Sequence, residues 1–420
     1  MALEITAAKP NPALLDLPWS IPLAEWPDEH LAALPRGISR HVVRFVRVSG
    51  NVIAVKEINT DLAVREYNML RFLKKIGQPC VQPFGVINGR IDASGEELDA
   101  CLLTRHLHFS LPYRTLFSQS LRPDTAQRLI DALAVLLVRL HLAGFWWGDV
   151  SLSNTLFRRD AGAYAAYLVD AETGEIRSTL SDGQREHDLD IARVNIAGEL
   201  MDLEAGGFLS ATVDPIDVSQ TIVDRYRSLW RELTGRERFE QGCRWRIDDR
   251  IRRLNELGFD VDELTISTDF GGATIQIQPK VVDAGHHSRR LLRLTGLDVE
   301  ENQARRLLND LDTFRASQDR QNDDMAIVAH DWLSTVYEPV TRTVPRDLTR
   351  KLEPAEVFHE VLEHSWYLSE KAGHDIPLEE VIADYIKKVL PGKPDEAAVL
   401  GTDTAEMPVT MSHEPESPAS

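Results

Sequence analysis

Asp149, Asn154 and Asp170 have the residue types and the spacing that the transfer of a phosphoryl group requires. Asn154 follows Asp149 by five residues, and Asp170 comes directly after an apolar stretch, residues 167–169. In this chemistry one carboxylate accepts or orients the proton of the attacking hydroxyl, while an amide and a second carboxylate hold magnesium against the nucleotide phosphates. The same residue types are common in helix caps and turns, where their side chains bond nearby backbone groups. For Asp149 and Asn154 both interpretations stay open at this point.

The sequence around these residues predicts a helix, a loop and a pair of strands. Residues 126–142 are apolar at helical spacing, and Gly144 follows as a helix end. Residues 155–158 and 164–169 predict two short strands that are joined by a turn at 160–162. The three polar residues would then lie in the loop before the first strand and directly after the second.

Lys56 is the charged residue of interest nearer to the N-terminus. It lies in the second strand of a predicted β-hairpin, and residues 63–76, which predict a helix, carry Glu66. A carboxylate on this helix would hold the ammonium group in place, since a free lysine has several rotatable bonds to freeze. A lone lysine in a strand is otherwise usually a solvated side chain. Glu57 and Arg65 are close enough in sequence to compete for the pairing.

The order of these charged and polar residues along the chain resembles that of protein-kinase-like enzymes. In those enzymes a strand lysine comes first, then a helix glutamate, then the aspartate and asparagine of the catalytic loop, and last a metal-binding aspartate. The corresponding residues here are Lys56, Glu66, Asp149, Asn154 and Asp170. The resemblance is to the branch with lipopolysaccharide and aminoglycoside kinases. More narrowly, the chain looks like a bacterial family that joins such a front half to an uncharacterised C-terminal domain. The resemblance covers roughly residues 36–205.

This resemblance implies an α+β fold with a two-lobed kinase-like domain that uses ATP and Mg²⁺. It implies that Asp149 is the catalytic base and that Asn154 and Asp170 bind magnesium. It also implies that Lys56 contacts the nucleotide phosphates, with Glu66 holding the lysine. Residues of this kind converge on a triphosphate and its divalent ion in phosphotransferases.

The chain departs from the family pattern at several positions. Ser151 stands where related enzymes have lysine or histidine; its hydroxyl could donate to a γ-phosphate but adds no positive charge. Trp147 replaces the usual loop histidine, and an indole can donate one bond but mainly packs. The triplet Asp170-Ala171-Glu172 replaces D-F-G. Its Glu172 is either a second metal ligand or an exposed loop carboxylate. No G-x-G-x-x-G is present, and residues 35–40 are the nearest candidate to cover the phosphates.

Two further segments would support the site. Residues 185–201 predict a helix, in which Asp188 or Asp190 either accepts backbone N–H bonds from the catalytic loop or is simply a helix-start charge. Residues 104–107 would connect the small sheet to the second lobe, where an adenine ring usually contacts the backbone.

Composition and charge limit the classes of protein that need be considered. The chain has 420 residues, of which 43% are hydrophobic, which is enough for two or three packed domains. Its formal net charge of −19 argues against a general nucleic-acid surface or an anionic-membrane surface. We therefore expect no nucleic-acid partner.

The cysteines and the N-terminal segment predict a cytoplasmic protein. Cys80, Cys101 and Cys243 are far apart and show no C-x-x-C spacing, so they suit buried thiols in a reducing compartment. The N-terminal segment has no basic stretch followed by an apolar core, so we expect no secretory signal. No apolar run approaches the ~20 residues of a membrane span.

The pattern along the chain predicts four segments. The first is a proline- and tryptophan-rich strap laid on a core, and the second is the kinase-like domain. A mostly helical domain with a short β-hairpin follows, and an acidic, proline-containing tail is expected to be disordered. Their expected bounds are 1–35, 36–205, 206–390 and 391–420.

The leading hypothesis is an ATP- and Mg²⁺-dependent phosphotransferase that acts on a hydroxyl of a small molecule or glycan. A protein acceptor is less favoured because the loop lacks the protein-kinase lysine and no A-P-E segment appears. The alternative is a nucleotide-binding pseudokinase whose C-terminal domain docks a protein partner. Phosphate release that disappears in Asp149→Asn would support the enzyme, and nucleotide binding without turnover would support the scaffold.

Overall fold

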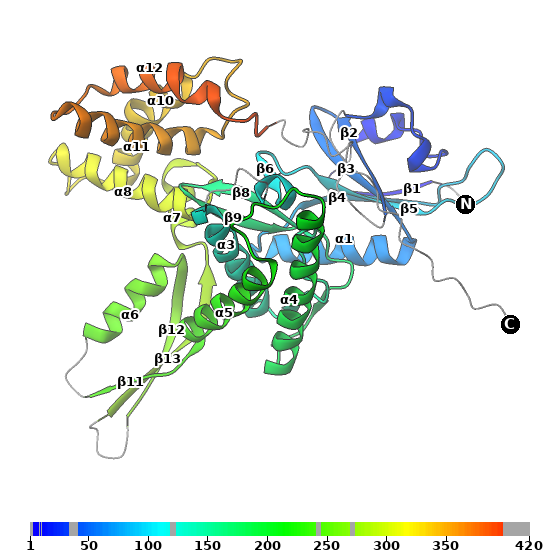
Figure 1. Ribbon diagram of the computed structural model, residues 1–420, viewed down its shortest axis with the longest axis horizontal. Coiled ribbons are helices and arrows are strands. Elements are labelled where there is room, and N and C mark those ends of the chain that lie inside the picture. Colours follow the sequence, from blue (N-terminus) through cyan, green and yellow to red (C-terminus); the bar gives the residue numbers. More distant parts are fainter. Residues whose placement is uncertain are drawn as a thin grey trace.

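The chain folds as a mixed α and β protein with a sheet-containing lobe near the N-terminus and a mostly helical region towards the C-terminus (Figure 1). This confirms the predicted α+β class. The computed structural model describes residues 3–7, 9, 11–32, 41–117, 123–240, 245–268 and 274–397.

The N-terminal lobe is built on a five-stranded antiparallel sheet against which one helix packs. In spatial order its strands are β1 (Glu4–Ala7), β4 (Gln82–Asn88), β5 (Ala100–Arg105), β3 (Asn51–Ile58) and β2 (Val42–Val48). The helix α1 (Thr60–Lys75) begins at an Asn59 cap and follows β3 directly. Ser49 and Gly50 both have positive φ in the β2–β3 turn, as tight hairpins require. This hairpin sets Lys56 on the central part of the sheet.

The N-terminal strap packs on this sheet as short 3₁₀ helices rather than as an extended segment. Its prolines favour such single turns, because they fix φ and remove backbone donors. The buried Arg90 guanidinium donates to the carbonyl oxygens of Trp19 at 3.0 Å and Ile21 at 2.7 Å and so ties the strap to β4. The turns are Pro12–Asp16, Leu23–Glu25 and Asp28–His30.

The second lobe combines helices with two small sheets. Its helices are α2 (Tyr113–Leu116), α3 (Pro123–Leu142), α4 (Asp182–Ala205) and α5 (Pro215–Thr234). Its strands are β6 (Ser110–Pro112), β7 (Phe145–Trp146), β8 (Thr155–Asp160), β9 (Ala163–Leu168) and β10 (Glu175–Ile176). β8 and β9 form the predicted hairpin, with β6 on its other edge, and β7 pairs with β10. The loop between β7 and β8 carries the candidate catalytic residues.

The apolar core of this lobe continues past the predicted boundary at residue 206. Ile222 and Tyr226 of α5 are buried in the same cluster as Leu137 of α3 and Ile196 of α4. Leu254 and Phe259 belong to it as well. The Gly206–Gly207 turn therefore separates two helices of one core and does not mark a break in packing.

An arm of one helix and three strands follows α5 and extends away from the core in Figure 1. Its elements are β11 (Glu237–Glu240), α6 (Trp245–Glu256), β12 (Phe259–Thr268) and β13 (Thr274–Ala284). The structure thus has the expected strand pair, with β11 as a third strand, and the turn at Gly271–Gly272 lies outside the described residues.

Residues 286–397, which we call the C-terminal helical domain, have an apolar core of their own. Its regular elements are α7 (His286–Thr295), α8 (Glu301–Ser317), α9 (Met325–Trp332), a π-helical turn (Leu333–Tyr337), α10 (Glu338–Arg342), α11 (Pro354–Ala372), α12 (Leu378–Lys388) and a 3₁₀ turn (Leu390–Gly392). Residues 391–397 differ from the expected disordered tail because Glu396 is buried against Arg159. The rest of the tail lies outside the described residues.

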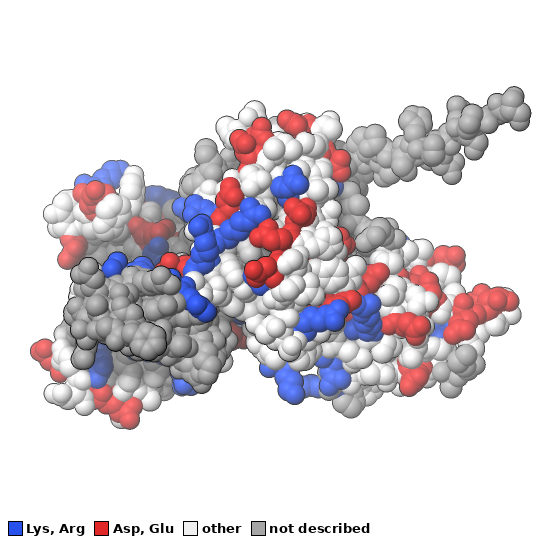
Figure 2. All heavy atoms as spheres, turned by 90° about the horizontal axis from the view of Figure 1, so that it is seen from below, with Lys and Arg blue, Asp and Glu red and all other residues white. Residues whose placement is uncertain are grey.

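Acidic and basic side chains are interspersed over the face seen in Figure 2, in keeping with the mixed composition. Cys80 and Cys101 are buried free thiols, as expected, and Cys243 lies outside the described residues. Within the described ranges, we find no helix that combines the length and the apolar character needed to cross a bilayer.

Candidate active site

Lys56 contacts Glu66, its predicted partner, and also Asp170, the predicted magnesium ligand. Its Nζ donates to Oε2 of Glu66 on α1 at 3.1 Å and to Oδ2 of Asp170 at 2.6 Å. The side chain is only 13% exposed, so these charges interact in a partly desolvated setting. Glu57, the competing carboxylate, instead pairs with Arg90 at 2.6 Å. Asp170, which lies 114 residues beyond Lys56 in sequence, thus meets the Lys56–Glu66 pair of the N-terminal lobe.

The pKa values of Lys56 and Glu66 are both shifted in this cluster. Burial alone would lower the pKa of Lys56, but the nearby charges of Glu66 and Asp170 outweigh it and raise that pKa above its ordinary value. Burial, and then the charge of Asp170, raise the pKa of Glu66 to about 7, against the opposing effect of Lys56. Lys56 is therefore held as a cation.

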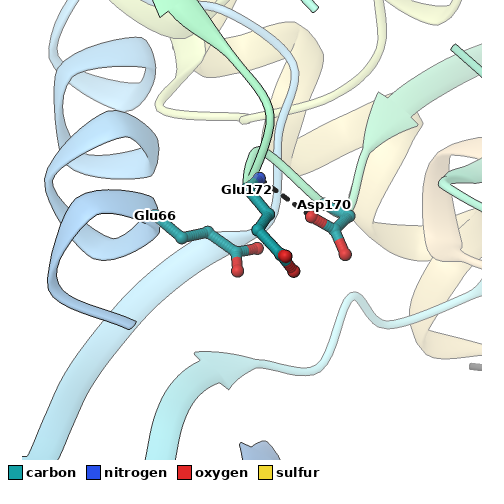
Figure 3. A group of neighbouring side chains, drawn as sticks. All are labelled: Glu66, Asp170 and Glu172. Carbon is teal, nitrogen blue, oxygen red and sulfur yellow. Dashed lines mark hydrogen bonds between the residues drawn. The ribbon is translucent and has the colours of Figure 1, made fainter. Parts of the chain in front are cut away.

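Glu172 belongs to the same cluster and is not a free loop carboxylate. Its Oε2 lies 3.2 Å from Lys56 Nζ and 3.2 Å from Nε2 of His41, and its backbone N–H donates to Oδ1 of Asp170 at 2.9 Å. Figure 3 shows Glu66, Asp170 and Glu172 pointing toward one another from α1 and from the segment after β9. Their ligand oxygens lie within 4.8 Å of one another, and such oxygens suit Mg²⁺.

Asp149 and Asn154 form the second half of the site. The amide Nδ2 of Asn154 donates to Oδ2 of Asp149 at 3.1 Å and to its backbone oxygen at 3.1 Å. The N–H of Val169 donates to the Asn154 carbonyl at 3.0 Å, which sets Asn154 beside the residue that precedes Asp170. The candidate magnesium ligands Asn154 and Asp170 therefore lie at the same end of the β8–β9 hairpin.

Helix α4 supports the candidate catalytic loop, residues 147–154, through three polar side chains. Asp188 is fully buried and accepts the backbone N–H bonds of Trp147 and Gly148, each at 2.8 Å. Glu199 accepts those of Leu152 and Ser153, at 2.7 and 2.9 Å. The geometry favours loop support over a simple helix-start charge as the role of Asp188. The loop has no strand partner for these backbone N–H groups, so they need other acceptors.

Asn195, the third of these side chains, reaches the candidate base itself. Its Nδ2 donates to Oδ1 of Asp149 at 3.2 Å and to the Val150 carbonyl at 3.2 Å. Neither Asn195 nor Glu199 was predicted from the sequence. Their spacing from Asp188 places all three residues on one face of a helix, but nothing in the sequence indicates that this face of α4 contacts the loop.

Comparisons with known proteins bear on the same residues. Residues 44–197 match the Lipopolysaccharide kinase (Kdo/WaaP) family. Residues 228–390 match the Domain of unknown function DUF4032. Together these matches confirm the resemblance to a lipopolysaccharide-kinase-like family with an uncharacterised C-terminal domain.

A comparison with curated proteins found no match. Among solved structures, the chain described as "WaaP in complex with acyl carrier protein" is 16% identical, with a TM-score of 0.35, over 61% of this chain and 99% of that chain.

Trp147, at the position of the usual kinase loop histidine, supports the segment that carries Asp170, the candidate metal ligand. Its indole Nε1 donates to the Asp170 carbonyl oxygen at 2.9 Å, and the ring is fully buried. Its own carbonyl accepts a bond from Thr173 Oγ1 at 2.7 Å. In this kinase-like domain a tryptophan therefore both packs and makes the supporting hydrogen bond.

Ser151 makes its hydrogen bonds within the loop, and its predicted contact with a γ-phosphate stays a prediction. Its side chain is buried, and its Oγ accepts the N–H of Asn154 at 3.2 Å and lies 3.2 Å from Oγ of Ser153. These bonds favour a role in holding the loop over the predicted contact with a γ-phosphate. The segment 35–40, the candidate phosphate cover, lies outside the described residues.

Proposed function

We propose that the chain is an ATP- and Mg²⁺-dependent phosphotransferase that acts on a hydroxyl of a small molecule or glycan. The observation that carries this proposal is the convergence of Lys56, Glu66 and Asp170, which are 10 and 114 residues apart in sequence. A partly buried lysine between carboxylates, together with a loop aspartate and an asparagine, is a set of groups that suits nucleotide phosphates. The lipopolysaccharide kinase match supports the kinase-like class.

Each residue would take one role. Asp149 accepts the acceptor hydroxyl's proton as the oxygen bonds to the γ-phosphorus and the bond from that phosphorus to the bridging oxygen breaks, which releases ADP. Asn154 and Asp170 offer the oxygen ligands that would hold magnesium, and Lys56 contacts the phosphates. Bound magnesium would neutralise phosphate charge. Glu66 keeps Lys56 in place.

The connection between β10 and α4 supports a non-protein acceptor. Only residues 177–181 join Ile176 to Asp182. Protein kinases instead place a phosphorylated activation segment between the metal-binding aspartate and A-P-E. A chain with so short a connection has little segment for a peptide to lie against, so a compact hydroxyl acceptor fits better.

Turnover of Mg-ATP tests this proposal. We expect purified protein to release phosphate or to transfer it to a supplied glycan or to itself, and Asp149→Asn to reduce the rate by about 10²–10⁴-fold. The matched control is Asp190→Asn, which makes the same chemical change at an exposed position of the neighbouring helix α4. Nucleotide binding without turnover, with acceptors supplied, would instead support the pseudokinase. Equal rates in Asp149→Asn and wild type would contradict the proposed base.

A further inference from the structure

The β8–β9 hairpin connects the two candidate metal ligands to the rest of the molecule. Asn154 directly precedes β8, and Asp170 follows β9 by two residues, so both lie at the open end of the hairpin. The closed end is the turn Ala161–Gly162, in which both residues have positive φ. A hairpin is a rigid pair of strands with a fixed register, so a displacement of its turn is transmitted to its open end.

The turn is held by the N-terminus of helix α8. Asp160, the last residue of β8, is buried and accepts the backbone N–H of Gln303 at 2.7 Å and that of Asn302 at 3.2 Å. The side-chain amide of Asn302 adds a third bond at 2.9 Å. A carboxylate in this position satisfies helix donors that have no partner within the helix and interacts favourably with the helix dipole. The kinase-like lobe thus caps a helix of the other domain.

Helix α11 binds the same turn with its first residues. Oε2 of the buried Glu356 accepts the backbone N–H of Ala161 at 2.9 Å and the side-chain amide of Gln303 at 3.1 Å. Gln303 also donates to the Arg159 carbonyl at 3.2 Å. Two helices of one domain therefore meet the hairpin through bonds to its backbone.

Ion pairs extend this contact along the strands. Arg158 pairs with Glu300 at 2.9 Å and with Glu353, and Arg159 pairs with Glu396 at 2.6 Å. Tyr167 of β9 donates its hydroxyl to Glu300 Oε1 at 2.6 Å. The apolar cores of the two parts form separate clusters, so the contact depends largely on directional polar bonds. Such bonds fix an orientation more tightly than an apolar contact does.

The opposite end of the hairpin is tied to the N-terminal lobe. Leu168 donates its N–H to the Pro79 carbonyl at 3.0 Å, and its own carbonyl accepts the N–H of Val81 at 2.9 Å. The hairpin is therefore held between the sheet lobe at one end and the C-terminal helical domain at the other (Figure 1).

We infer that the C-terminal helical domain is a positioning element of the phosphotransferase site, which it acts on through the β8–β9 hairpin. This inference rests on the proposed function. None of the contacts described above joins the domain to Asp149 or Asp170 directly. Its residues at the turn therefore are positioning residues and set where Asn154 and Asp170 stand relative to each other. The part of the matched domain of unknown function that lies within this helical domain, residues 286–390, thereby gains a role within this chain.

A charge exchange in the full-length protein tests the inference. Glu396→Arg places two cations together at Arg159, and the double variant Arg159→Glu with Glu396→Arg restores an opposite pair. For Glu396→Arg we expect turnover of Mg-ATP to fall about tenfold and half-saturation to need more Mg²⁺, because a small displacement of reacting groups has large effects. Amide exchange over residues 149–170 should become faster. The double variant should recover most of each change.

The control is Arg342→Glu, which reverses a charge in the exposed Arg342–Glu338 pair of α10, away from the hairpin. We expect it to leave turnover and Mg²⁺ dependence unchanged. If Glu396→Arg does not fold, Glu356→Ala is measured in the same way, because it removes the acceptor of the Ala161 N–H without adding a charge.

Wild-type rates and Mg²⁺ dependence in a folded interface variant would overturn the inference, as would faster hairpin exchange without any catalytic change. These results leave the proposed function intact. Wild-type protein that neither turns over nor binds Mg-ATP would contradict the proposed function itself and the inference with it.

Discussion

The side-chain amide of Asn195 donates to Oδ1 of Asp149 at 3.2 Å, opposite the amide of Asn154, which donates to Oδ2 at 3.1 Å. Both carboxylate oxygens of the candidate base are thus held by amides from two different elements. The rotamer of Asp149 is therefore fixed from both sides, which orients the carboxylate before an acceptor arrives.

This relationship predicts the effect of changing Asn195. Asn195→Ala should lower kcat for Mg-ATP turnover by about 10- to 100-fold with little change in the KM for ATP, because the base loses its orientation. Asn195→Asp should move the acidic limb of the pH–rate profile to higher pH, since two adjacent carboxylates resist losing both protons. Steady-state kinetics across pH measures both effects. An unchanged profile in Asn195→Asp would show that residue 195 does not act on the base.

Lys56 is predicted to serve both nucleotide binding and stability, and the two roles can be separated. Lys56→Met leaves the buried Glu66 beside Asp170 without a cation, so we expect a loss of ~3–5 kcal/mol in the free energy of unfolding and a much weaker affinity for ATP. The double variant Lys56→Met with Glu66→Gln should regain most of the stability but not the affinity. Chemical denaturation and calorimetric titration measure the two. Recovery of ATP affinity in the double variant would exclude a phosphate contact by Lys56.

Trp147→Phe should remove the indole bond to the Asp170 carbonyl while keeping most of the packing. We expect a loss of about 1 kcal/mol in stability and a higher Mg²⁺ requirement. The matched control is Trp146→Phe, because the Trp146 indole N–H has no hydrogen-bond partner among the described residues. Equal Mg²⁺ requirements in the two variants would argue against a supporting role for Trp147.

The contribution of Asp160, which contacts the C-terminal helical domain, to the stability of the folded protein is expected to depend on pH. Burial raises the pKa of Asp160 to about 7, and the charge of Glu300 acts in the same direction, against the N–H bonds from α8. Between about pH 4 and pH 7 the folded protein holds a proton that the unfolded chain has released. The contribution of this group to stability therefore falls as pH rises through that window.

Asp160→Asn should remove this dependence. The difference in unfolding free energy between pH 5 and pH 8 should be smaller in the variant than in wild type, by on the order of 2 kcal/mol. Urea denaturation at the two values measures it. Identical differences in both proteins would mean that Asp160 is ionised throughout.

Much of the site could be predicted because its residues lie in short local patterns. The five-residue spacing of Asp149 and Asn154, and an aspartate directly after an apolar strand, are properties of the sequence alone. The strand position of Lys56 and the helix position of Glu66 followed from periodicity. Their meeting at 3.1 Å needed only that these two elements be adjacent.

The supports of the site could not be predicted in the same way. Asn195 and Glu356 act through contacts between elements that are far apart in sequence, and no local pattern states which helix face meets which loop. The Gly206–Gly207 turn suggested a domain boundary because glycine pairs commonly end elements, yet α5 packs into the same core. Residue 396 was assigned to a disordered tail by its acidic surroundings, and its pairing with Arg159 overrides that composition.

In the proposed active site, Lys56, Asn154 and Asp170 surround the phosphates and the divalent ion of a nucleotide. A crystal structure with Mn²⁺ and a non-hydrolysable ATP analogue tests it most directly, because the anomalous signal locates the metal. We expect manganese bound between Asn154 and Asp170, with the phosphates next to Lys56 Nζ. A nucleotide bound elsewhere, or a metal that contacts neither Asn154 nor Asp170, would contradict it.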